Sequence, residues 1–232
     1  MRLLDCGCGP GSITAGLATV VAPGQAVGLD ASPAQLDAAR ASVTHPTVDF
    51  RLGSVYELPF DDGSFDAVFA HSLLTHLRQP ARALEEMRRV LAPGGVLAIA
   101  DDDHGTMVWE PADPLLLEWH TLWMRIMRAH GADPTRARRH RRALLEAGFV
   151  DVVGGAKVGT ETRGTPDGVA HFAQVLAHQM RQPALANFAL AQGWADRERL
   201  DAMAAAVEAW AASPGAFVAI TSFTALGWAP RA

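Results

Sequence analysis

The chain of 232 residues is long enough for one α/β domain with a sizeable core and a helical addition. Hydrophobic residues make up 49% of it and charged residues 19%, a composition that argues against intrinsic disorder. The formal net charge of −5 argues against nucleic acid as the main partner, because phosphate binding relies on an excess of Lys and Arg.

The two cysteines, Cys6 and Cys8, stand one residue apart, and the sequence holds no third cysteine for a disulfide framework. Two thiols alone are also too few ligands for a zinc site. No apolar run approaches the length of a membrane span, and the first residues lack a signal-peptide pattern. We therefore expect a cytoplasmic protein with no membrane span.

The first half of the chain alternates short β-like runs with amphipathic helices, which indicates a parallel sheet with crossover helices. The predicted strands span residues 2–6, 26–30, 48–52, 66–70 and 96–100, with a helix at 12–20 after the first. Ser32, Pro33 and Gln35 form the N-cap, first position and capping box of the next helix. Pro80 opens a third helix, which the Pro-Gly-Gly turn at 93–95 ends.

The second half of the chain is mostly helical. The predicted elements are helices at 113–130 and 133–148, helical chain over most of 165–212, and extended runs at 149–158 and 216–226. Breaks are expected near Pro183 and Gly193. We interpret the helical segments at about 113–147 and 165–212 as insertions in one domain, because no linker or repeat separates them.

A strand that runs into a Gly-rich turn is the strongest local signal. Residues 3–11 read Leu-Leu-Asp-Cys-Gly-Cys-Gly-Pro-Gly. Glycines let the backbone bend sharply and touch a ligand, and the start of the next helix presents free N–H groups. A dinucleotide fingerprint would place glycine at position 12, where Ser12 stands. The turn alone is also compatible with a strand–helix connection that binds nothing.

Asp30 ends the second predicted strand and is expected to lie beside this turn. In a doubly wound sheet, an acid at that position can accept hydrogen bonds from both hydroxyls of a ribose. The alternative is a solvated loop aspartate. Together, the turn and Asp30 favour a ligand that contains a ribose.

Four ordered blocks extend this pattern, and with them the chain resembles the class I S-adenosylmethionine (SAM)-dependent methyltransferases, in the type 11 branch that includes the ubiquinone and menaquinone biosynthesis enzymes. The blocks are residues 4–11, 28–32, 58–66 and 85–95. The resemblance implies a Rossmann-like, doubly wound α/β sheet of seven strands in the order 3-2-1-4-5-7-6. Its last strand, 216–226, would be antiparallel, with 149–158 as its partner.

The resemblance also implies a SAM site. Its cofactor-binding positions would be Asp5, Gly7, Gly9, Gly11, Asp30, Ala31, Gln35, Ser54, Val55 and His71. Asp5 and the three glycines would hold the methionine end of SAM, and Asp30 the ribose. Ala31 and Gln35 would lie near the adenine, and Ser54 and Val55 along its edge. His71 would lie near the sulfonium and its methyl group.

The sequence departs from the family in two places. Many relatives have Asp where Ser54 stands, to accept from the adenine amino group, although a Ser oxygen can still accept. The first strand also begins almost at Met1, where relatives usually carry a helical segment that covers SAM. Either such an N-terminal segment is missing from this sequence or the pocket is unusually open, and of the two we favour a missing segment.

By resemblance, residues 1–232 form a single methyltransferase domain, with residues 1–102 as the SAM-binding half and 103–232 as the substrate-side half. The helical insertions would form a lid over the carboxyl ends of the strands. Trp119 and Trp123 share an apolar stripe on the first lid helix, and we expect them to pack in the core and to line the substrate pocket.

Methyl transfer to a small-molecule acceptor is an in-line displacement, and it needs a general base only if the acceptor must lose a proton. The candidate bases are His71, His76 and His104, which follow the fourth and fifth strands, although each also fits a hydrogen-bonded loop residue. The acidic run 101–103 could hold a hard cation such as Mg²⁺. We interpret it instead as a solvated loop and predict no metal, because no second set of ligands is evident.

Two other functions stay open. A nicotinamide-dependent oxidoreductase would share the Gly-rich turn and Asp30, but Ser12 and the blocks at 58–66 and 85–95 count against it. A SAM-binding protein without catalysis, acting as a regulator or partner subunit, would share all four blocks. The sequence leaves the acceptor atom, O, N, C or S, undetermined.

Overall fold

The computed structural model describes residues 1–160 and 165–231. It divides into two compact units. The first comprises Met1–Asp101, Arg136–Ala156 and Phe223–Ala232, and the second comprises Asp102–Thr135 and Lys157–Ser222. The prediction of a single domain over 1–232 stays a prediction, as does the lid. Of the helices in the described residues, none combines the length and apolarity that a membrane crossing requires.

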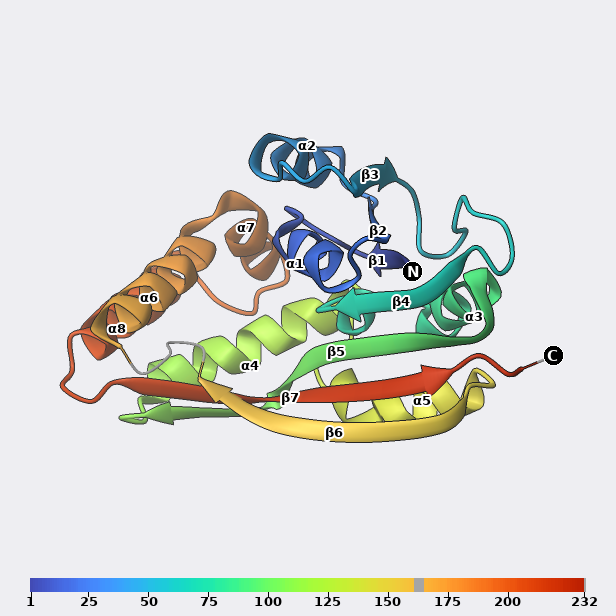
Figure 1. Cartoon of the computed structure of the whole chain (residues 1–232). Coiled ribbons are helices and arrows are strands. Elements are labelled where there is room, and N and C mark those ends of the chain that lie inside the picture. The colour runs from blue at the N-terminus through green and yellow to red at the C-terminus, as the bar shows by residue number, and fades with distance from the viewer. Residues whose placement is uncertain (161–164, 232) are drawn as a thin grey trace. The chain divides into compact units, whose positions relative to one another are not determined.

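The sheet has seven strands in the order β3-β2-β1-β4-β5-β7-β6, which confirms the predicted order (Figure 1). The strands are β1 (Arg2–Cys6), β2 (Gln25–Asp30), β3 (Val48–Leu52), β4 (Phe65–His71), β5 (Leu91–Glu110), β6 (Val150–Thr160) and β7 (Phe217–Trp228). The first five lie parallel, and β7 runs against its neighbours (Figure 1). Gly94 N donates to Ala229 O at 3.1 Å and Ala229 N donates to Gly95 O at 2.8 Å, which fixes one end of the β5–β7 pairing.

The helices of the first unit connect and cover these strands. They are α1 (Ser12–Val20), α2 (Pro33–Ser42), α3 (Pro80–Val90) and α5 (His140–Glu146), with short 3-10 turns η1 (Leu74–His76) and η2 (Arg136–Arg139). The predicted cap of α2 is present, since Ser32 Oγ accepts from Gln35 N at 3.4 Å. Buried strand residues such as Leu4, Val68 and Leu97 form one hydrophobic core with the inward face of α3.

The second unit has a separate hydrophobic core. Its helices are α4 (Pro114–Ala129), α6 (Pro166–Arg181), α7 (Pro183–Ala191) and α8 (Arg197–Ala211). Asp113 caps α4, because its Oδ1 accepts from Leu115 N at 2.7 Å and Leu116 N at 3.3 Å. The helical chain breaks near Pro183 and Gly193, as predicted. Trp119 and Trp210 are buried at the centre of this core.

Two sequence predictions are wrong. The fifth strand was expected to end at 100, but β5 continues to Glu110, and Asp101 and Asp103 are 1% and 0% exposed rather than part of a solvated loop. Asp101 Oδ1 accepts from Thr75 Oγ1 and Asp103 Oδ1 accepts from Gly105 N, and a hydropathy pattern cannot show such partners. The helix expected over 133–148 is shorter, because it begins with the 3-10 turn η2 and is α-helical only in α5.

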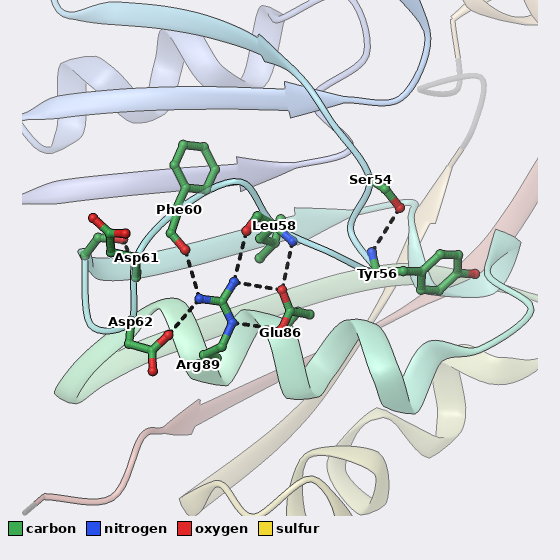
Figure 2. Close-up of polar contacts among 9 residues, drawn as sticks. Ser54, Tyr56, Leu58, Phe60, Asp61, Asp62, Glu86 and Arg89 are labelled. Carbon is green, nitrogen blue, oxygen red and sulfur yellow. Dashed lines mark hydrogen bonds and ion pairs between the residues drawn. The ribbon is translucent and has the colours of Figure 1, made fainter.

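A polar junction joins two of the sequence blocks that carry the family resemblance (Figure 2). Arg89 of α3 donates to Glu86 Oε1 and Oε2, to Asp62 Oδ1, and to the carbonyl oxygens of Leu58 and Phe60, at 2.8–2.9 Å. These bonds use all five N–H groups of the guanidinium. Glu86 Oε2 also accepts from Leu58 N at 2.8 Å. The junction therefore anchors the far end of the loop that follows β3.

Candidate functional site

The Gly-rich turn between β1 and α1 has left-handed backbone at its three glycines, with φ of 71° at Gly7, 51° at Gly9 and 79° at Gly11. A Cβ at Gly7 would lie 2.8 Å from Leu73 Cδ1, and one at Gly11 would lie 2.6 Å from Phe50 Cζ. Gly9 differs, because Gln35 Oε1, at 3.9 Å, is the only atom of the described residues within 4 Å of its Cβ position. Packing explains Gly7 and Gly11, whereas Gly9 borders open space where a ligand could approach the backbone.

Asp30 lies against this turn, as the sequence predicts. Its Oδ2 accepts from Gly9 N at 2.9 Å, and its Oδ1 accepts from Ser32 N at 2.8 Å. A carboxylate has about four lone-pair positions, so two remain for a ligand. Asp30 O accepts from Gly53 N at 3.0 Å, which ties the loop after β3 to the end of β2. The turn, Asp30 and this loop thus form one connected site.

The other predicted adenine residues border the same region. Ala31 is exposed directly after Asp30, and the side chain of Gln35 extends toward Gly9. Val55 is buried. Ser54 Oγ accepts a hydrogen bond from Tyr56 N at 3.2 Å, which leaves one lone pair of that oxygen (Figure 2). Their roles in cofactor binding stay predictions.

The amino end of α1 supports this site. Gly11 occupies the N-cap position, and no side chain of the described residues caps the first turn. By contrast, Ser32 caps α2 and Asp113 caps α4. The first N–H groups of α1 therefore lack the side-chain acceptor that α2 and α4 have, as do those of α3, α5 and α7.

Asp5 is buried behind the turn, at 2% exposure, and its Oδ2 accepts from Thr14 Oγ1 at 2.6 Å. Burial raises the pKa of Asp5 to about 6, although the Thr14 hydrogen bond and the charge of His71 act in the opposite direction. Asp5 therefore titrates close to neutral pH. His71 directly follows Ala70, which pairs in register with Cys6 just before the turn.

We expect the Asp5→Asn variant to become more stable relative to the native chain as the pH rises. A raised pKa in the folded state means that stability is fully present below the unfolded pKa of 3.8 and is lost as the pH rises through about 6. Asparagine does not ionise but keeps an oxygen acceptor for Thr14. Between pH 4.5 and 7.5 the difference in unfolding free energy should grow by about 2 kcal/mol in favour of the variant. Urea unfolding at four pH values measures it, and a difference that stays flat with pH contradicts the prediction.

The three candidate bases fall into different surroundings. His71 is exposed at the last position of β4, opposite Ala100 of β5, and is followed by Ser72 with an unusual φ of 50°. His76 is exposed at the end of η1. His104 was expected in a loop after the fifth strand, but it lies within β5 and in the second unit. Its ring centroid is 4.4 Å from that of Trp123.

A buried polar cluster in the first unit was not predicted from the sequence. His140 Nε2 lies 2.8 Å from Asp101 Oδ2, and Thr75 Oγ1 donates to Asp101 Oδ1 at 3.2 Å. All three side chains are almost fully buried. The cluster ties the carboxyl end of β5 to η1 and α5. A prediction that β5 continues past residue 100 would have placed Asp101 inside the sheet and so indicated the cluster.

The second unit contains a cavity of about 350 Å³. Aromatic side chains dominate its walls, namely Trp109, Trp119, Trp123 and Phe172. His104 and His120 contribute polar atoms. Trp119 therefore both packs in the core and lines the cavity, as expected from the sequence. Within residues 1–160 and 165–231, no group of three or more His, Cys, Asp or Glu is arranged to hold a metal ion.

Part of the first unit is similar to known proteins. The model of the family described as "Methyltransferase domain" matches residues 4–99. An uncharacterized methyltransferase of Schizosaccharomyces pombe is 35% identical over 161 residues, 64% of this chain and 56% of the relative. A demethylmenaquinone methyltransferase of Roseiflexus castenholzii is 34% identical over 138 residues, 57% of this chain and 56% of the relative. The chain thus matches little more than half the length of these relatives.

A solved structure, the [4+2]-cyclase SpnF, is 25% identical with a TM-score of 0.58, covering 100% of this chain and 76% of that one. Its name belongs to a different reaction, so the fold comparison alone does not define the chemistry. The family match is more specific, because residues 4–99 contain the Gly-rich turn, Asp30 and the Arg89 junction. Residues 4–99 therefore match the methyltransferase domain family, and both relatives named above are methyltransferases.

Proposed function

We propose that this chain transfers the methyl group of SAM to a small-molecule acceptor by in-line displacement. The observation that carries the proposal is the link between Asp30 and Gly9 inside the matched domain, which joins the ribose-binding acid to the Gly-rich turn. SAM supplies a methyl group already activated on a sulfonium. The tasks of the chain are therefore to bind, orient and exclude water, and orientation alone is worth about 7–11 kcal/mol in favourable cases.

The residues of the turn fit this cofactor. Two lone-pair positions of Asp30 suit the two hydroxyls of a ribose, and the open space at Gly9 suits a ligand chain that passes the backbone. Asp5, Gly7 and Gly11 would hold the methionine end. The adenine would lie along Ala31, Gln35, Ser54 and Val55. The carboxylate of Asp5 would attract the ammonium of SAM, and its pKa would then fall on binding.

The cavity of the second unit is the proposed acceptor site. It is concave, mostly apolar and at the lower end of the roughly 300–1,000 Å³ range of ligand pockets. His71, His76 and His104 remain candidate general bases. The cytoplasmic location and the lid also stay predictions.

The two alternatives make different predictions. A nicotinamide-dependent oxidoreductase would not account for the family match over residues 4–99. A SAM-binding protein without catalysis would keep the first site and leave the cavity without a methyl acceptor. A third alternative is that the cavity serves another reaction, because a structure of similar fold is named a cyclase.

Calorimetric titration with SAM and NAD, followed by incubation with isotopically methyl-labelled SAM and a metabolite panel, tests the proposal. We expect SAM to bind and NAD not to bind, and mass spectrometry should detect label in a small-molecule product. Binding of NAD in place of SAM would contradict the cofactor assignment. Tight SAM binding with no labelled product over a broad panel would favour the non-catalytic alternative.

A further inference from the structure

The loop that follows β3 is bonded to α3 at its far end and to the residues before α3 at its near end. The Arg89 junction described above holds the far end (Figure 2). At the near end, the hydroxyl of Tyr56 accepts from Arg78 N at 3.1 Å and from Gln79 N at 3.3 Å. All of these residues belong to the first unit, so the arrangement does not depend on where the second unit lies.

The Tyr56 hydroxyl supplies an acceptor at a place where α3 has no cap of its own. Gln79 holds the N-cap position of this helix without a side-chain cap bond, and Pro80 has no N–H. Arg78 and Gln79 are exposed, so water can accept from their N–H groups when the phenol is removed. The two bonds therefore determine where Tyr56 lies more than they stabilise the folded chain.

Ser54 is fixed through the backbone of Tyr56. Tyr56 N donates to Ser54 Oγ at 3.2 Å (Figure 2), and Glu57 N donates to Ser54 O at 3.2 Å. On the other side, Gly53 N donates to Asp30 O at 3.0 Å. Ser54 thus lies between Tyr56 and the aspartate that the proposed function assigns to the ribose. Because Tyr56 N uses one lone pair of Ser54 Oγ, the place of Tyr56 sets the direction of the other lone pair.

We propose that the Tyr56 hydroxyl is a positioning group of the cofactor site. By bonding to the chain before α3, it holds Ser54 Oγ, on an exposed residue, in the orientation that accepts from the adenine amine. The inference rests on the proposed function, because it takes Ser54 as part of the adenine edge. Tyr56 acts through Ser54 and needs no contact of its own with the cofactor. Loss of the hydroxyl should therefore reduce discrimination between bases and leave the fold in place.

Two ligands that differ only at the base test the inference. They are S-adenosylhomocysteine and its 6-deamino analogue, which has hydrogen in place of the adenine amine, and calorimetry measures the affinity of each for the full chain. The native chain should bind S-adenosylhomocysteine at least about fivefold more tightly, because the analogue lacks one hydrogen-bond donor. Tyr56→Phe keeps the ring, which packs against the core of the first unit, and removes only the hydroxyl. In this variant the ratio should fall below about twofold.

Two further variants separate positioning from a general loss of stability. Ser54→Ala removes the acceptor itself, so it should also bring the ratio close to one. Val21→Ala shortens a buried side chain in a hydrophobic cluster with Leu3 and Ala18, away from the loop. It should lower the melting temperature and keep the fivefold ratio, because both ligands bind the same folded state. The inference is overturned if the ratio survives in Tyr56→Phe or in Ser54→Ala, or if it falls equally in Val21→Ala.

Amide hydrogen exchange without any ligand tests the anchor directly. In Tyr56→Phe the amides of residues 53–57 and 78–79 should exchange at least about threefold faster than in the native chain, because their segment opens locally. Residues 58–62 should keep their protection, since the Arg89 junction still holds them. Unchanged exchange at 53–57 would show that the hydroxyl does not hold the loop, and this result also overturns the inference.

The outcomes distinguish this inference from the proposed function. A native chain that binds S-adenosylhomocysteine and its 6-deamino analogue equally well overturns the role of Tyr56 and leaves methyl transfer standing. A native chain that binds neither ligand contradicts the cofactor assignment itself, and the inference fails with it.

Discussion

Replacing Arg89 with alanine is expected to lower the free energy of unfolding by about 1–3 kcal/mol, the cost of leaving partly buried acceptors without their donor. The guanidinium is 30% exposed and all of its N–H groups are bonded. Its removal strands the carboxylate of Glu86, which is 19% exposed, and two backbone carbonyls. The hydrogen bond from Arg89 also holds the pKa of Glu86 below its usual range, which favours the charged carboxylate.

Two further variants make this expectation specific. Arg89→Lys keeps the charge but offers a single ammonium in place of a planar fork, so it should recover less than half of the loss. Arg142→Ala removes an arginine of α5 that forms an ion pair with Glu146, and both side chains are 67% exposed. This change should cost less than about 0.5 kcal/mol. Urea unfolding measures all three. A loss for Arg89→Ala as small as that for Arg142→Ala would mean that the junction does not stabilise the domain.

The order of the strands could be predicted because its signals are local and are supported by a family resemblance. Each strand of the first half is a short apolar run bounded by a turn, and the Ser32 cap marks the start of α2 within the sequence itself. Asp30 could be placed beside the Gly-rich turn for the same reason, since both follow adjacent parallel strands. What the sequence did not predict is that Asp30 already bonds to Gly9 and Ser32, because backbone partners leave no residue pattern.

The acidic run at residues 101–103 could not be predicted correctly from local sequence. Three successive aspartates are typical of a solvated loop, yet Asp101 bonds to Thr75 and lies against His140, residues 26 and 39 positions away in the chain. Burial of a carboxylate depends on such distant partners, which no local pattern encodes. The cavity is a similar case. Its walls combine β5, α4 and α6, so it can be recognised only after folding.

Asp30→Ala is expected to weaken SAM binding by about a hundredfold, or about 2.7 kcal/mol. Charge-assisted hydrogen bonds to two ribose hydroxyls are worth about 1.5–3 kcal/mol each, and some of that energy is recovered by water in the variant. Asp30→Asn keeps the shape and one acceptor oxygen but loses the charge, so its affinity should fall between those of the native chain and Asp30→Ala. Calorimetric titration of SAM into the three proteins measures the order.

The loss of SAM affinity in Asp30→Ala needs a control, because Asp30 also has a structural role. Its carboxylate also accepts from Gly9 N and Ser32 N, so Asp30→Ala releases two backbone donors and could loosen the turn itself. Thermal unfolding of the SAM-free proteins shows how much of the loss is structural. Asp49→Ala is the matched control, because that exposed carboxylate bonds to Arg51 and pairs in register with Val27, about 10 Å along the strand from Asp30. It should leave SAM affinity within about twofold of the native value. Equal affinity for the native chain and Asp30→Ala would mean that the ribose does not lie at Asp30, even though residues 4–99 match the methyltransferase domain family.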